Sequence, residues 1–310
     1  MQVHKDITQL PAFKNAVVTT GTFDGVHTGH QQIIAQLKAE ADRVNGETVI
    51  ITFHPHPRTV VKHNPSAVHL LNTLDEKIWL LRQKGIDHLV VVPFNEAFSN
   101  LSAHDYIHDF LYTRFRPHTV IIGYDHRFGK NRQGDYHLME QKGVELGFVV
   151  KEIPEQVLNE VAISSTRIRE AIAHNDVITA NYCLGYPYFF EGLVVEGNRL
   201  GRTIGYPTAN LRIQQEEKLV PGNGVYAVTI NIAGEILKGM MNIGVRPTVN
   251  GVNRTIEVNI FDFDKDIYGQ VLRINVHHYL RGEQKFNGLD ALKEQLAHDR
   301  SQAIELLQPL

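Results

Sequence analysis

The chain has 310 residues, of which 43% are hydrophobic and 21% are charged, and this composition excludes a disordered or fibrous protein. At roughly 150 residues per domain, the length predicts about two domains. The formal net charge of −3 is close to balance, so the sequence predicts no general attraction to nucleic acid or to an anionic membrane.

The cysteine content and the short apolar runs exclude further classes of protein. Cys183 is the only cysteine, so the chain forms no intrachain disulfide and no cysteine-based metal cluster. The longest strictly apolar run, Leu89–Val92, is far shorter than the roughly 20 residues of a membrane-spanning helix. Residues 1–14 lack the apolar core of a signal peptide. We therefore expect a cytoplasmic protein without a membrane partner.

The first 150 residues alternate between strand-like and helix-like segments. Short β-branched runs recur at the spacing of a βα unit, at Val17–Thr20, Val49–Phe53, Leu89–Val92, Thr119–Ile122 and Phe148–Val150. Thr73 with Glu76, and Ser102 with Asp105, predict helix starts between them, because each hydroxyl can accept a hydrogen bond from a free N–H of the first turn. This pattern predicts a doubly wound parallel α/β domain over residues 1–182.

The second part of the chain has a different pattern. Beyond Gly185-Tyr-Pro187, strand-like runs follow one another without helices, at Phe189–Glu196, Val225–Ile232, Ile236–Ile243, Thr255–Phe263 and Val271–Tyr279. Turn residues separate them, as at Ala233-Gly234, and one amphipathic helix is expected over Leu289–Leu307. This pattern predicts a small antiparallel β-barrel with a C-terminal helix over residues 183–310.

The loop after the first long strand of the α/β domain, Gly21–His30, ends in His-x-Gly-His at the start of an amphipathic helix. In an open α/β sheet this turn lies where ligands bind. A helix N-terminus presents free N–H groups and partial positive charge to an anion, and His27 and His30 can both face that anion. Gly29 lets a large ligand approach the backbone. Nucleotidyl transfer needs such donors, because negative charge develops on the α-phosphate.

Two alternative roles for the histidine pair stay open. The chain has 17 histidines, so His27 and His30 could be ordinary surface residues. A zinc site is disfavoured, because the spacing is not His-Glu-x-x-His and no third ligand is evident in the sequence. The loop also matches neither the Gly-x-Gly-x-x-Gly pattern nor the Walker pattern. The glycine-containing loop together with the pair favours an anion site.

Two further segments carry polar groups suited to phosphates. In Ile163–Arg169, Ser164 or Ser165 can cap a helix, and the helix start with Arg167 can hold β- and γ-phosphates; a plain capped helix is the alternative. In Gly197–Asn210, glycines at spacings of four allow a phosphate chain to come close. Thr208 and Asn210 offer oxygen ligands of the kind that Mg²⁺ accepts, and a hairpin loop with a proline turn is the alternative.

The sequence Gly-Thr-Phe-Asp-Gly-Val-His-Thr-Gly-His over residues 21–30 resembles the FMN adenylyltransferase module of bacterial bifunctional riboflavin kinase/FAD synthetases. That module belongs to the nucleotidyltransferase superfamily related to class I aminoacyl-tRNA synthetases. Phe53–Pro57, Gly123–Gly129 and Ile163–Arg169 agree in the same order, although the family usually has phenylalanine at His126. The resemblance implies that His27 and His30 stabilise the α-phosphate, that Asp125 lies near the flavin or the nucleotide, and that Arg127 lies near the flavin. It implies nucleotide contacts by Gly21, Thr22, Phe23, Asp24, Gly29, Ser164, Ser165, Thr166 and Arg167.

The sequence Gly-Tyr-Pro-Thr-Ala-Asn over residues 205–210 resembles the signature of riboflavin kinases, and four later stretches agree in order up to Phe286. The resemblance implies that Glu257 is the general base and that Arg281 lies near the flavin. A solvent-facing glutamate on an edge strand is the alternative for Glu257. The resemblance also implies nucleotide contacts by Gly201, Arg202, Gly205, Pro207, Thr208 and Asn210, with Thr208 and Asn210 as Mg²⁺ ligands.

One departure from the kinase pattern follows the expected base. The family often has Thr-His after this glutamate, whereas this chain has Val258-Asn259. Because side chains alternate along a strand, Asn259 is expected on the same face as Glu257, where its amide could replace one hydrogen bond of the imidazole.

The resemblance implies a bifunctional enzyme that phosphorylates riboflavin to FMN and then adenylylates FMN to FAD, with release of pyrophosphate. ATP is the implied co-substrate and Mg²⁺ the implied cofactor. Two other hypotheses stay open. A nucleotidyltransferase for another phosphate acceptor fits the N-terminal loop but not the C-terminal signature. A non-catalytic flavin or nucleotide sensor, with RNA binding by analogy, would be expected to lack the catalytic residues or to carry a basic surface.

Overall fold

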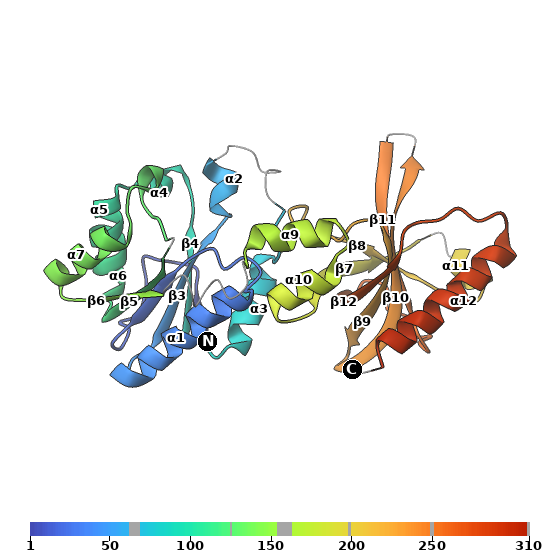
Figure 1. The fold of residues 1–310 in the computed structure, drawn as a ribbon, viewed down its shortest axis with the longest axis horizontal. Coiled ribbons are helices and arrows are strands. Elements are labelled where there is room, and N and C mark those ends of the chain that lie inside the picture. Colours follow the sequence, from blue (N-terminus) through green and yellow to red (C-terminus); the bar gives the residue numbers. More distant parts are fainter. Residues whose placement is uncertain (62–68, 125, 154–162, 198–199, 249–250, 309–310) are drawn as a thin grey trace. The chain divides into compact units, whose positions relative to one another are not determined.

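The computed structural model describes residues 1–61, 69–124, 126–153, 163–197, 200–248 and 251–308 (Figure 1). The chain forms two compact units, Met1–Ser165 and Thr166–Leu310. The domain boundary predicted between residues 182 and 183 stays a prediction.

The first unit contains a six-stranded sheet in which every neighbouring pair is parallel (Figure 1). The order is β1-β4-β3-β2-β5-β6, for β1 (Gln2–His4), β2 (Val17–Thr20), β3 (Thr48–His54), β4 (His88–Pro93), β5 (Thr119–Gly123) and β6 (Val149–Ile153). The five predicted strands and the parallel sheet are confirmed. Strand β1 was not predicted, because three residues are too few to show an alternating pattern. Since β2 lies between β3 and β5, the loop that follows β2 lies at the topological switch point, where ligands bind in such sheets.

Helices connect these strands. They are α1 (Thr28–Val44), α2 (Pro57–Val61), α3 (Leu74–Gln83), α4 (Glu96–Ser99), α5 (Ala103–Asp105), the π-helix η2 (Tyr106–Tyr112), α6 (Thr113–Phe115), the 3₁₀ helix η3 (Lys130–Arg132) and α7 (Tyr136–Leu146). Both predicted helix starts are confirmed. Thr73 and Glu76 form a reciprocal capping box on α3, and Ser102 accepts from the N–H of Asp105. Buried residues of η2 pack with alternate residues of the sheet and form one core.

The second unit is a closed antiparallel barrel in the order β10-β11-β8-β7-β12-β9. Its strands are β7 (Tyr188–Val195), β8 (Ala209–Arg212), β9 (Gly224–Ile232), β10 (Glu235–Thr248), β11 (Gly251–Ile260) and β12 (Val271–Arg281). The predicted barrel is confirmed. A two-residue turn with positive φ at Ala233 and Gly234 joins β9 to β10, which fits the twist of a hairpin. Strand β8 was not predicted, because it is short and its first two residues belong to the Gly-Tyr-Pro-Thr-Ala-Asn motif.

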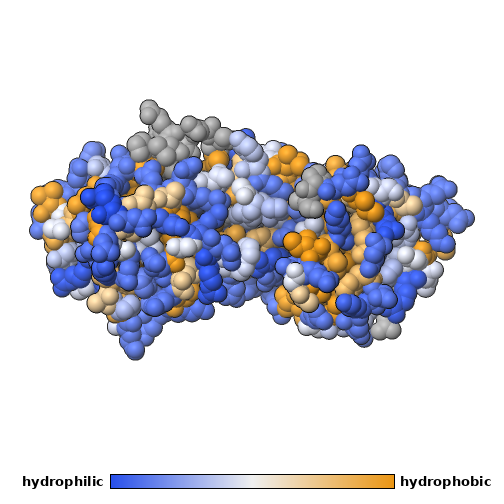
Figure 2. Space-filling model, turned by 90° about the horizontal axis from the view of Figure 1, so that it is seen from below, coloured by the Kyte–Doolittle hydropathy of each residue, from blue (hydrophilic) through white to orange (hydrophobic). Residues whose placement is uncertain are grey.

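In the described residues from 163 onward, the helices are α9 (Ser165–Ala173), α10 (Val177–Leu184), α11 (Leu200–Thr203) and α12 (Leu289–Leu306). The predicted C-terminal helix is confirmed as α12, and Ala303 and Leu307 are buried with Met240 and Phe261 of the barrel region. Helix α10 was not predicted, because its apolar residues occupy most positions and mark no single stripe. No helix in the described ranges is long and apolar enough to cross a membrane. On the face drawn in Figure 2, hydrophilic residues predominate and apolar ones form separate groups.

A buried carboxylate in α1 predicts how the stability of the first unit depends on pH. Glu40 is 5% exposed and accepts hydrogen bonds from Arg43 at 2.8 Å, from Lys151 at 2.6 Å and from Thr119 at 3.1 Å. These bonds, the one from Arg43 above all, lower the pKa of Glu40 to about 2 against the opposing effect of burial. Because the folded pKa lies below the unfolded one, the ionised carboxylate stabilises the fold above about pH 4.5, and this contribution is lost as the pH falls toward 2.

We expect Glu40→Gln to lower the free energy of unfolding of the first unit by about 2 kcal/mol at pH 7, allowing for the solvent exposure of Arg43 and Lys151. The deficit should shrink as the pH falls toward 3. Amide hydrogen exchange of β5 residues in the full chain measures it. The exposed Glu96→Gln is the control, with an expected change below about 0.5 kcal/mol. A Glu40→Gln deficit that did not vary with pH would contradict this assignment.

Candidate active sites

The loop that joins β2 to α1 has an unusual backbone. Phe23 and Val26 have φ values of 47° and 35°, in the left-handed region that side chains other than glycine rarely adopt, and Gly25 has a φ of 87°. Phe23 and Val26 are both buried. Packing therefore holds the loop in a conformation that the local sequence alone disfavours.

Asp24 fixes this loop from inside. Its buried carboxylate accepts hydrogen bonds from the N–H of Leu71 at 3.0 Å and of Asn72 at 3.2 Å. Its carbonyl accepts from Ser165 Oγ at 2.9 Å. The structure thus brings two predicted nucleotide-binding residues, Asp24 and Ser165, together. Their observed contacts are with the protein, and they position the loop.

His27 and His30 lie against each other where the loop enters α1. Their rings stack with centroids 3.7 Å apart. His27 is 7% exposed and caps the helix, since its Nδ1 accepts from the N–H of His30 at 3.4 Å. A neutral His27 with Nδ1 as acceptor carries its proton on Nε2, so that this nitrogen is the donor of the ring. Burial of His30, with smaller effects of His27 and Lys77, holds the pKa of its imidazole well below the usual range.

Two glycines of the loop leave room for these rings. A Cβ atom at Gly29 would lie 3.3 Å from His27 Nδ1, and one at Gly21 would lie 3.2 Å from the Phe23 ring. Both distances are tighter than ordinary carbon contacts, so a side chain would push the rings. The two glycines are therefore needed for the packing of the rings in this loop, in addition to any role in ligand access. Neither histidine is an ordinary surface residue, so that alternative is wrong.

A polar chain that the sequence patterns did not reveal lies at the ends of β2 and β5. The Tyr106 hydroxyl lies 3.0 Å from Thr20 Oγ1, which lies 3.4 Å from His126 Nε2. Burial raises the pKa of Tyr106 to about 12, so its hydroxyl stays protonated at neutral pH. The His126 ring stacks at 5.9 Å on Phe128. The imidazole at this position is therefore held both by a hydroxyl and by an aromatic ring.

The other predicted residues of the first site have different positions. Asp125 lies outside the described residues. Arg127 forms an ion pair with Asp135 at 2.9 Å, and Asp135 caps α7. Ser164, Thr166 and Arg167 are exposed at the N-terminal end of α9.

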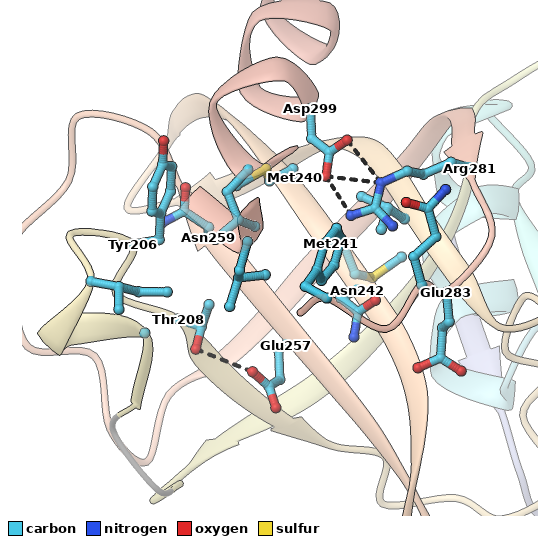
Figure 3. Close-up of a pocket in the computed structure, with 17 residues that line it drawn as sticks. Tyr206, Thr208, Met240, Met241, Asn242, Glu257, Asn259, Arg281, Glu283 and Asp299 are labelled. Atoms are coloured by element: carbon cyan, nitrogen blue, oxygen red, sulfur yellow. Dashed lines mark hydrogen bonds and ion pairs between the residues drawn. The ribbon is translucent and has the colours of Figure 1, made fainter. Parts of the chain in front are cut away.

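A cavity of about 290 Å³ opens between the barrel and α12, and Figure 3 shows its lining. Gly201, Thr208, Glu257 and Arg281, four of the residues predicted from the kinase motif, line it. Apolar groups complete the wall, namely Ile204, Val225, Met240, Met241, Phe286, Leu292 and Leu296. The cavity therefore combines an apolar surface with a few convergent polar groups, as ligand sites do.

Glu257 lies in β11, with β10 and β8 on either side, so the alternative of an edge-strand glutamate is wrong. Thr208 Oγ1 lies 3.5 Å from Glu257 Oε2 (Figure 3). In the ladder, Glu257 is opposite Asn210. The β8–β11 pairing therefore brings the threonine and asparagine of the motif to the glutamate.

The remaining kinase-motif residues shape the strand and loop beside the cavity. Gly197 and Gly201 are closely packed, since a Cβ at Gly197 would overlap Asn210 Nδ2 and one at Gly201 would overlap the Tyr206 carbonyl. Gly205 has a φ of 88°. The residues Arg202, Gly205, Pro207 and Asn210 are not among those that line the cavity.

Asn259 lines the same cavity as Glu257, as the alternation of the strand predicted (Figure 3). Its Nδ2 donates to the Pro207 carbonyl at 2.7 Å. The amide therefore holds the backbone of the Gly-Tyr-Pro-Thr-Ala-Asn segment next to the glutamate.

A buried ion pair fixes Arg281, at the end of β12, inside the cavity. Arg281 Nε donates to Asp299 Oδ1 at 2.9 Å and Nη2 donates to Oδ2 at 2.7 Å, so the contact has two parallel bonds (Figure 3). Gln295 also donates to Asp299 at 2.8 Å. Asp299 was missed in the sequence, where the only signal is one acid among the apolar positions of a helix. It orients the guanidinium that the kinase motif predicted near the flavin.

Comparisons with known proteins agree over nearly the whole chain. Residues 10–167 match the FAD synthetase family and residues 184–307 match the riboflavin kinase family. The bifunctional riboflavin kinase/FMN adenylyltransferase of Haemophilus influenzae is 37% identical over 92% of both chains. That of Bacillus subtilis is 38% identical, over 93% of this chain and 92% of its own. A solved structure described as a macrolide-efflux protein from Streptococcus pneumoniae is 30% identical, with a TM-score of 0.88 and 97% coverage of both chains.

Proposed function

The chain belongs to the bifunctional riboflavin kinase/FMN adenylyltransferase family, and on this basis we propose that it makes FMN from riboflavin and then FAD from FMN, with ATP as the co-substrate of both steps. The residues that match the riboflavin kinase family carry the first step, and those that match the FAD synthetase family carry the second. We propose the domain boundary between residues 182 and 183, and the cytoplasm as the location.

In the kinase step, Glu257 accepts the proton of the ribityl 5′-hydroxyl as that oxygen bonds to the γ-phosphorus and ADP leaves. The cavity supports this role, because the carboxylate lies at its wall beside the Thr208 hydroxyl. The flavin ring would lie along the apolar wall, with the Arg281 guanidinium beside it, held in place by Asp299.

Mg²⁺ fits the donors next to Glu257. Thr208 and Asn210 can each supply one side-chain oxygen, and Mg²⁺ commonly takes one or two protein ligands and completes its shell with phosphates and water. No cluster of three or more His, Cys, Asp or Glu side chains suited to a metal occurs in the described part of the chain. The oxygen donors of Thr208 and Asn210 support a Mg²⁺ ion held by these two residues together with the nucleotide. When bound, it neutralises charge on the phosphates.

In the adenylyl-transfer step, a phosphate oxygen of FMN bonds to the α-phosphorus of ATP and the bond to pyrophosphate breaks. His27, His30 and the N-terminal N–H groups of α1 would donate to the α-phosphate oxygens, where negative charge develops. Ser164, Ser165, Thr166 and Arg167 would hold the leaving pyrophosphate. Two observations support this assignment. His27 caps α1 and its ring stacks on that of His30, so both imidazoles lie at the N-terminus of the helix.

The direct test is incubation of the purified chain with riboflavin, ATP and Mg²⁺, with the flavins separated by chromatography over time. FMN that appears first, followed by FAD, is the expected result. FMN without FAD would limit the activity to the kinase step. No turnover of riboflavin or of added FMN would contradict the proposed function and favour the sensor hypothesis.

A further inference from the structure

The two histidines of the adenylyl-transfer loop are poorly suited to carry positive charge. Their rings stack at 3.7 Å, so two imidazolium ions would repel each other at short range. Nδ1 of His30 is buried and has no hydrogen-bond partner within the described residues, so nothing there stabilises a proton on it. The lowered pKa of His30 agrees with a neutral ring. The histidines can donate hydrogen bonds, but a fixed positive charge has to come from another group.

Lys77 is a buried cationic side chain directly beneath this loop. It is the fourth residue of α3 and is only 6% exposed, which is rare for lysine. Its Nζ donates to the Thr22 carbonyl at 2.6 Å, and Thr52 Oγ1 donates to the same oxygen at 3.1 Å. Burial lowers the pKa of Lys77, while the Asp24 carboxylate opposes this and favours the charged form.

We propose that Lys77 is the buried cation of the adenylyl-transfer site, a positioning residue that holds the Thr22 carbonyl and supplies positive charge beneath the loop that receives the α-phosphate. Lys77 does not contact the substrate. It acts by holding the loop in place and by the electrostatic potential of its positive charge. This inference rests on the proposed adenylyltransferase function.

Two observations favour this role over a purely structural one. First, the Asp24 carboxylate already accepts two main-chain N–H bonds, from Leu71 and Asn72, so it does not need a lysine to satisfy it. Second, a buried ammonium is costly to desolvate, and the Asp24 carboxylate offsets only part of that cost, since burial still lowers the pKa of Lys77. A charge in a site of low polarity also acts over a longer distance than it would in water.

The test compares Lys77→Met, which keeps the length and removes the charge, with Lys77→Arg, which keeps the charge. We expect Lys77→Met to lower kcat for conversion of FMN to FAD by about 30- to 100-fold, with a change in KM for FMN below about threefold. Lys77→Arg should recover kcat to within about tenfold of the original chain. Riboflavin phosphorylation by the same preparations reports on folding of the second unit and should not change, and amide hydrogen exchange of the first unit reports on folding around Lys77.

The pH profile separates charge from packing. The titratable groups that interact with Lys77 from the loop and from α1 are Asp24 and His30. Removing the ammonium removes a charge that opposes protonation of His30, so Lys77→Met should move the acid limb of kcat/KM to higher pH, by about half a unit or more. Lys77→Arg should leave the limb in place. Leu80→Ala, one turn further along α3, removes buried apolar packing but no charge and should move neither the limb nor kcat at a permissive temperature.

Three results would overturn the proposal. One is a Lys77→Met chain with unchanged formation of FAD. Another is an equal loss of FMN to FAD conversion in Lys77→Met and Lys77→Arg while kinase activity is intact. The third is a His30 titration that does not shift in Lys77→Met. This titration is followed by NMR when turnover is too slow to give a pH profile. Failure of the proposed function would look different, because the unmodified chain itself would then convert no FMN to FAD.

Discussion

Glu257→Gln is expected to lower kcat for riboflavin phosphorylation by about 10²- to 10⁴-fold, the usual contribution of a general base. The amide keeps the size of the side chain but cannot accept the hydroxyl proton. Because β8 and β10 flank β11, the backbone at residue 257 stays in place, and the loss concerns the chemistry of the side chain. Phosphorylation is measured as FMN formed from riboflavin and ATP.

The adenylyl-transfer activity of the same Glu257→Gln preparation is its internal control, since FMN added directly should still be converted to FAD. Glu235→Gln, at an exposed position of β10, is the matched control in the barrel and should keep kinase activity. A Glu257→Gln chain that phosphorylated riboflavin at the original rate would remove Glu257 from the mechanism.

His30→Ala is expected to have the opposite effect, a loss of about 10²- to 10³-fold in FMN to FAD conversion with riboflavin phosphorylation unchanged. The substitution removes a ring donor from the N-terminus of α1. It keeps the main-chain N–H of residue 30, which donates to the capping side chain of His27, so the start of the helix is preserved. The reaction is followed with FMN and ATP as substrates, and pyrophosphate release gives a second measurement.

His104→Ala serves as the control for His30→Ala, because it removes an exposed imidazole of the same unit. The two main substitutions also test each other. If either Glu257→Gln or His30→Ala lost both activities while it stayed folded, the assignment of two separate sites would be wrong.

Local patterns predicted most of the fold and failed where tertiary context decides. The β-branched runs identified β2 to β5, because a parallel strand buried on both faces is nearly continuously apolar, and the run Phe148–Val150 identified the largely exposed edge strand β6. The run Val225–Ile232 has apolar residues at both odd and even positions, which predicts burial on both faces of the strand. All but the last two residues of β9 are buried. Strand β8 pairs through residues that the sequence assigns to a ligand loop, and its strand conformation depends on β7 and β11.

The site could be predicted only in part, for a similar reason. The three-residue spacing of His27 and His30 predicted that both can face one anion, because positions i and i+3 share a helix face. The contact of Lys77 with Thr22 spans 55 positions and that of Asn259 with Pro207 spans 52. No periodicity connects such partners, and a lysine in the first turns of a helix usually indicates a solvated face. Only the folded arrangement shows that this lysine is buried beneath the loop.

The closure of the barrel bears on how the chain resists aggregation. The barrel strands pair around a closed ring, but Gly244–Thr248 of β10 pair only with β11, so edge-to-edge addition of a foreign strand can start at this ribbon as well as at β1 or β6 of the open sheet. Strand β1 has three residues, too few to template a long pairing. Strand β6 exposes Val149 but follows it with charged Lys151 and Glu152. A strand that docked at β6 would have to bury these charges, so this edge of the open sheet is protected against such pairing.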